Sequence, residues 1–68
     1  MEILLEGNML TLLGADWKKD APSIFNAIHQ ADVLVGIRVE GEAIKLKCYQ
    51  GSEERLQEVA ALLRGTFS

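Results

Sequence analysis

The chain carries a single cysteine and a single histidine, the side chains most often used for nucleophilic or acid–base chemistry. Cys48 ends an alternating segment in which it shares a face with Ile44 and Leu46, so we expect a buried, unreactive thiol. His29 falls late in a helical segment and off its apolar stripe, where a cation near the helix C-terminus is favourable. Neither residue has a partner at a catalytic or metal-ligand spacing. The sequence therefore predicts no catalytic, cofactor-binding or metal-binding residue, and it favours a protein that is not an enzyme.

Trp17, Lys18 and Lys19 form the only cluster of aromatic and basic residues, within a segment (14–20) that is predicted to be a loop. In one interpretation Trp17 covers the open end of the core and the lysines stay solvated. In the other, the cluster contacts a ligand or a protein partner, because loops carry function and tryptophan is favoured at binding hot spots. A pocket lined by Trp17, Lys18 and His29 would indicate a ligand-binding or enzyme subunit whose site forms between protomers.

A smaller basic strip, Arg38, Lys45 and Lys47, lies beside Tyr49. Sheets that expose aromatic and basic side chains can bind single-stranded RNA by stacking and by charge. The whole chain has a net charge of −3, however, and an acidic domain is a poor electrostatic partner for nucleic acid or for an anionic membrane. Nucleic-acid binding is therefore an alternative function and not the leading one.

Two β-hairpins are predicted to position these residues. Segments 2–6 and 9–14 flank Gly7-Asn8, and segments 33–40 and 43–49 flank Gly41-Glu42. A glycine in the first position of a two-residue loop suits a turn that needs a positive φ there. Such short loops fix the register, and the register places one entirely apolar set on a single face of the sheet. Its members are Ile3, Leu5, Leu10, Leu12, Val35, Ile37, Val39, Ile44, Leu46 and Cys48.

Two amphipathic helices are predicted to follow the hairpins. The first spans 21–31 with Asp20 as its N-cap, and the second spans 53–64 with Ser52 as its N-cap and Gly65 at its end. Each carries one apolar stripe at helical spacing, which would pack on the apolar face of the sheet.

The chain also matches itself. Residues 2–31 and 36–65 align without gaps at an offset of 34, which places Glu6-Gly7 on Glu40-Gly41. The prediction is one α+β domain over residues 1–68: a two-layer sandwich with a four-stranded antiparallel sheet, two helices on one face, and an internally duplicated ββα–ββα order.

Short connections and right-handed crossovers favour the strand order 2-1-3-4, which makes the second and fourth strands the sheet edges. The fourth strand carries Lys45 and Lys47, which discourage edge pairing, whereas the second strand (9–14) has no charge and is open to another strand. The second strand also contributes to a candidate interface on the other face of the sheet. The residues of that candidate interface are Leu4, Met9, Thr11, Leu13 and Leu34. Scattered apolar surface without a partner is the alternative interpretation.

Size supports association. A chain of 68 residues buries only about 60% of its unfolded surface, and one cysteine cannot form an internal disulfide. The single thiol and the lack of a basic leader or a long apolar segment indicate a soluble, cytoplasmic protein. The leading function is a small protein-interaction or regulatory module, homodimeric and without a cofactor. The alternatives are a nucleic-acid-binding module and a ligand-binding or enzyme subunit.

Overall fold

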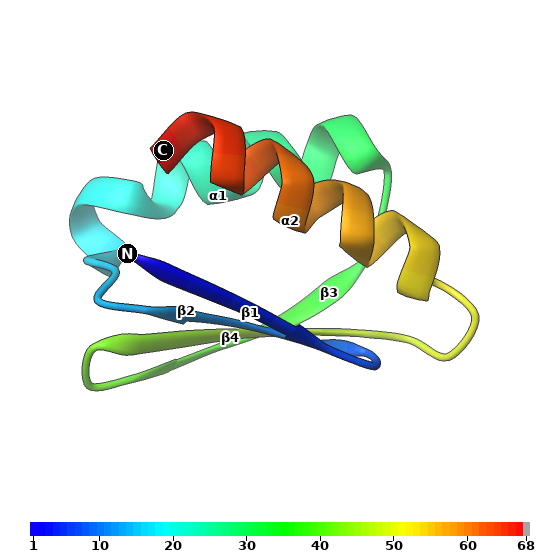
Figure 1. The fold of residues 1–68 in the computed structure, drawn as a ribbon, viewed down its shortest axis with the longest axis horizontal. Helices are drawn as coiled ribbons and strands as arrows, with labels where there is room; N and C mark the ends of the chain where they lie inside the picture. The colour runs from blue at the N-terminus through cyan, green and yellow to red at the C-terminus, as the bar shows by residue number, and fades with distance from the viewer. Residues whose placement is uncertain (68) are drawn as a thin grey trace.

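A four-stranded antiparallel sheet lies beneath two helices, which confirms the predicted α+β class and the ββα–ββα order (Figure 1). The computed structural model describes residues 1–67. The elements, in chain order, are β1 (Glu2–Glu6), β2 (Met9–Leu13), α1 (Trp17–Ala31), β3 (Val35–Glu40), β4 (Ala43–Cys48) and α2 (Glu53–Phe67). Within this part of the chain, no helix has the length and apolar character needed to cross a membrane.

The strand order is β1-β2-β4-β3, so the predicted order was wrong. The central strands are β2 and β4, and the edges are β1 and β3. Both orders keep the two hairpins and join β2 to a parallel β3 across one intervening strand, so the preference for short connections alone does not separate them. The argument from lysine failed because Lys45 and Lys47 are on the open face of the sheet, where a charged side chain reaches solvent from a central strand too.

The predicted register is confirmed in both hairpins. Leu5 pairs with Leu10, and Val39 pairs with Ile44. The turn glycines Gly7 and Gly41 have φ values of 58° and 59°, the left-handed region that favours glycine.

The central ladder between β2 and β4 relates the hairpins by an approximate two-fold axis. Met9 pairs with Lys47, Leu13 pairs with Ala43, and Thr11 pairs with Lys45 midway between them. This axis superposes each residue of the first hairpin on the residue 34 positions later in the second hairpin.

The apolar face of the sheet meets both helices and forms the core. Its central members are fully buried, whereas the edge-strand residues are only partly buried and Val39 is exposed. The largest fully buried side chains at the centre of the core are Leu10, Leu12, Ile24, Ile44, Leu46, Leu56, Val59 and Leu63. Burial of the ten residues predicted on the apolar face therefore decreases from the central strands to the edge strands.

The first helix begins four residues earlier than predicted, and this corrects the predicted loop 14–20. Asp16, not Asp20, is the N-cap: its carboxylate accepts a hydrogen bond from the Lys18 backbone N–H at 3.1 Å. Asp20 lies in the first turn, largely buried, and its Oδ2 accepts from the Asp16 backbone N–H at 2.9 Å. The two aspartates together satisfy N–H groups that a helix start leaves unpaired, so Trp17 belongs to the helix.

The second helix continues through Gly65 to Phe67, so the predicted end at Gly65 was also wrong. Tertiary contacts offset the weak helix propensity of glycine, since Phe67 packs against the core. The helices start at Trp17 and Glu53, 36 positions apart, and their buried residues follow the same spacing. Ile24 and Ala60 are both fully buried, for example, whereas the offset of 34 would pair Ile24 with the exposed Glu58.

Candidate interaction surface

The edge of β3 presents backbone groups that have no strand beside them. At the two ends of the central ladder, Cys48 N donates to Asn8 O at 3.0 Å and Gly14 N donates to Glu42 O at 2.9 Å. Hydrogen bonds alternate sides along an antiparallel strand, so the odd-numbered residues of β4 bond the even-numbered residues of β3. The N–H and C=O groups of Val35, Ile37 and Val39 therefore point away from the sheet.

Apolar side chains flank this edge. Val39 is 47% exposed, Phe25 on α1 is 52% exposed, and Leu34 just before β3 is 76% exposed. We call these three side chains, with Trp17 and the outward backbone of β3, the β3-edge surface. Its exposure follows from uneven helix packing: α2 packs on β1 and β2, and no comparable packing of α1 on β3 exists.

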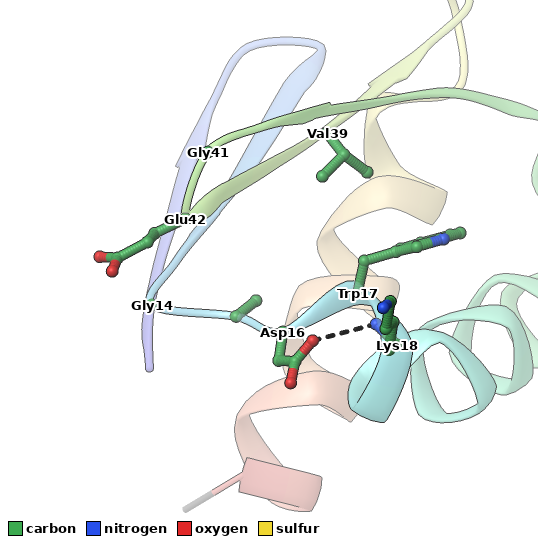
Figure 2. A pocket seen from close by; sticks show the side chains of 8 residues that line it. Gly14, Asp16, Trp17, Lys18, Val39, Gly41 and Glu42 are labelled. Carbon is green, nitrogen blue, oxygen red and sulfur yellow. Dashed lines mark hydrogen bonds between the residues drawn. The ribbon is translucent and has the colours of Figure 1, made fainter.

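A groove joins the edge strand to the start of α1 (Figure 2). Its volume is about 760 Å³, and Trp17 and Val39 face one another across it. The Asp16 cap fixes the first turn and so the direction of Trp17. The indole is partly buried against the core, and its ring meets the ring of Phe25 edge to face at 5.5 Å. This contact continues the apolar surface from the edge strand along α1.

A second hollow of about 420 Å³ continues the surface at the other end of α1, where Phe25, Ile28 and Leu34 line it with His29. His29 is therefore not in the groove of Trp17 and Lys18, so the structure does not bring together the predicted pocket of these three residues. Lys18 and Lys19 are exposed on the first turn of α1 and make no ion pair within residues 1–67.

The candidate interface residues separate into two places. Leu4 pairs with Thr11, and Met9 and Leu13 flank Thr11 on the same open face of the sheet. Leu34 lies instead beside α1, in the hollow with Phe25. The first four line β1 and the central strand β2, so they offer a face to a partner and not the free edge that was predicted for β2.

The basic strip is partly neutralised. Glu40 accepts from Arg38 at 3.1 Å and from Lys45 at 3.2 Å. Lys47 makes no ion pair in the described chain, and Tyr49 beside it is 70% exposed. The predicted residues do lie together, but one carboxylate compensates two of the three positive charges.

Cys48 is buried as predicted, at 2% exposure. Burial raises the pKa of its thiol, and the negative charge of Glu53 raises the pKa further. Both effects favour the protonated, unreactive form. Residues 1–67 contain no group of three or more histidine, cysteine, aspartate or glutamate side chains able to hold a metal ion.

Sequence reasoning missed Val39 and Phe25 as surface residues, because it assigned both to buried stripes. The pattern was correct, since Val39 does face the helix layer. The exposure of such a side chain depends on which strand lies at the sheet edge and on where the helix lies above it. The periodicity of apolar residues predicts neither of these.

The fold and this surface define a two-layer α+β domain whose β3 edge is flanked by exposed apolar side chains. Comparison with protein-family models, with curated proteins and with solved structures found no match to this chain.

Proposed function

We propose that this chain is a small protein-interaction module that forms a homodimer through the β3-edge surface. The observation that carries the proposal is the unpaired backbone of Val35, Ile37 and Val39 with exposed apolar side chains beside it. Sheet edges are normally covered or charged because they recruit other strands. This edge has neither proline nor covering helix, and its two charged residues, Arg38 and Glu40, pair with each other on the open face, which favours a strand added from another chain.

A two-fold axis gives the β3 edge a self-complementary register. Antiparallel pairing about Ile37 sets Val35 opposite the partner subunit's Val39, so all three outward residues bond across the axis. On the open face, the same register sets Gly36 opposite the partner subunit's Arg38 and keeps the two Arg38 side chains from facing each other. The product is a continuous eight-stranded sheet.

The size of the domain agrees with such an interface. A stable interface covers about 800 Å² per partner, and the total accessible surface of the described chain is 4422 Å². An interface of that size would occupy about a fifth of this surface. The free thiol of Cys48 fits a reducing compartment, which supports the cytoplasmic location that we propose with it. The matched registers of the hairpins similarly support an origin by duplication of one ββα unit.

Sedimentation velocity across a concentration series tests this function. Val39→Lys adds a charge at the edge, where strand addition would have to bury it, and we expect it to abolish association at this edge. Val39 is half exposed, so the variant should keep its circular-dichroism spectrum and its fold. Ala61→Lys is the matched control, because Ala61 occupies on α2 the exposed place that Phe25 occupies on α1. A Val39→Lys chain that associates as strongly as Ala61→Lys would overturn the proposal.

A further inference from the structure

The open face of the sheet is divided by charge. Its outward residues form rows that run across β1, β2, β4 and β3 in that order. The first row is Glu6, Met9, Lys47 and Gly36; the second is Leu4, Thr11, Lys45 and Arg38; the third is Glu2, Leu13, Ala43 and Glu40. The β1–β2 half is thus acidic and apolar, and all the basic residues lie on the β4–β3 half.

Gly36 leaves a hollow at the basic end of the first row. The space above it is about 480 Å³ and is lined by Met9, Arg38, Lys45 and Lys47. A β-carbon built on Gly36 would come no nearer than 4.0 Å to another atom, the Lys47 carbonyl oxygen, so the glycine is not there to avoid a clash within the chain. At the other end of the row, Glu6 makes no ion pair within residues 1–67.

We infer that the open face binds the open face of a second copy of this chain, with Glu6 of each copy in the Gly36 hollow of the other. A two-fold axis parallel to the strands lays β1 over the partner's β3 and β2 over the partner's β4. The unpaired Glu6 carboxylate then meets the unpaired Lys47 ammonium of the partner, and the arrangement repeats on the other side of the axis.

The charge pattern selects this axis. An axis perpendicular to the strands would set each half on itself, acid on acid and base on base, which opposes association. With the parallel axis, Leu13 lies over the partner's Ala43, and Leu4 lies over the aliphatic stem of the partner's Arg38. Only the third row brings like charges together, because Glu2 approaches the partner's Glu40. This repulsion is reduced because Arg38 and Lys45 already compensate the Glu40 carboxylate.

This contact is independent of the β3 edge and compatible with it. The edge dimer has its axis perpendicular to the sheet and beside β3, whereas the face dimer has its axis parallel to the strands, above the boundary between β2 and β4. Because the two axes do not intersect, a chain that uses both contacts grows as an open two-layer assembly and does not close at a fixed number of copies.

Charge exchange tests the inference. Glu6→Lys and Lys47→Glu should each weaken association through the open face at least about tenfold, because each places like charges together. The double variant Glu6→Lys/Lys47→Glu keeps the net charge and restores opposite charges across the axis, so it should recover wild-type association. Gly36→Val fills the hollow without changing charge, and it should block the face contact while the protomer stays folded.

Sedimentation velocity distinguishes the two surfaces. We expect the wild type to form species larger than dimers that grow with protein concentration, Glu6→Lys or Val39→Lys alone to stop at dimers, and the combined variant to be monomeric. Glu6→Lys or Lys47→Glu chains that associate like the wild type, or a charge exchange that fails to restore association, would overturn the face contact and leave the edge proposal standing. Titration with single-stranded RNA at low salt gives a further check. Tight binding that Lys47→Glu abolishes would assign the open face to nucleic acid and overturn the inference as well.

Discussion

The two ββα units bury the centres of their hairpins alike and their outer strands differently. Leu12 on β2 and Leu46 on β4 are equivalent, and neither has any exposed surface. Leu5 on β1 and Val39 on β3 are also equivalent, yet Leu5 is partly buried against the core and Val39 is 47% exposed. The difference shows that the sheet alone does not determine edge burial.

The helices account for this difference. The fourth strand runs one residue further than β2 relative to the offset of 34, and its connection to α2 (49–52) is one residue longer than the connection from β2 to α1 (14–16). The helices are therefore matched at 36 residues whereas the hairpins are matched at 34. The second helix covers its neighbouring edge, and the first leaves its own edge open. A similar pair of hairpins has therefore produced one flank packed against a helix and one flank with exposed apolar side chains.

The largest effects should come from the matched centre. Leu12→Ala and Leu46→Ala each leave a cavity in the core, and each should lower the free energy of unfolding by about 2–5 kcal/mol. A domain of this size has a total stability of about 3–10 kcal/mol, so both variants should unfold at much lower urea concentrations. Urea denaturation of both variants measures the effect. Costs that differ by more than about twofold would show that the two halves do not share the centre equally.

Substitutions at the N-termini of the two helices should differ more in their cost to stability than those at Leu12 and Leu46. Asp20→Ala removes the buried acceptor of the Asp16 N–H and should cost about 1–3 kcal/mol in the free energy of unfolding. Glu53 makes the corresponding contact in the other half, where its carboxylate accepts from the Gly51 N–H at 3.0 Å, but this contact is exposed. We expect Glu53→Ala to cost less than about 1 kcal/mol. Equal costs in urea denaturation would contradict the view that burial makes the first cap stronger.

The edge strands offer the next comparison. Leu5→Ala should cost about 1–2 kcal/mol because its side chain packs on the core, whereas Val39→Ala should cost less than about 0.5 kcal/mol in the monomer. The free energy of unfolding should be measured at a protein concentration at which the chain is monomeric, because association through Val39 would add to the stability of the wild type. A larger cost at Val39 than at Leu5 would show that α1 covers its edge after all.

The smallest effect concerns Cys48, which has Gly14 as its counterpart in the other hairpin. Its pKa is raised by burial and by Glu53, so the unfolded thiol ionises at a lower pH than the folded one. The folded state then binds the extra proton, and stability should fall as pH rises above the ordinary thiol pKa of about 8.5. The fall in the free energy of unfolding between pH 7 and pH 10 should be smaller in Cys48→Ala. A thiol reagent should label the native protein slowly and the urea-unfolded protein quickly, and rapid native labelling would contradict burial.

The amino-acid sequence determined the hairpins, their register and the inward face of the sheet. Two-residue loops with glycine first leave few alternatives, and alternation of apolar side chains makes a one-residue slip costly. These are local constraints, and the pairings of Leu5 with Leu10 and of Val39 with Ile44 followed from them.

Only the tertiary structure decided which strands became edges and how the helices were placed above them. A hairpin fits a sheet from either side with the same local contacts, so both symmetric strand orders satisfy the same pattern. Asp16 was not recognised as the cap because Asp20 is an equally suitable residue, and its burial beneath the first turn depends on packing. The exposure of Val39, and with it the proposed binding edge, results from these long-range choices.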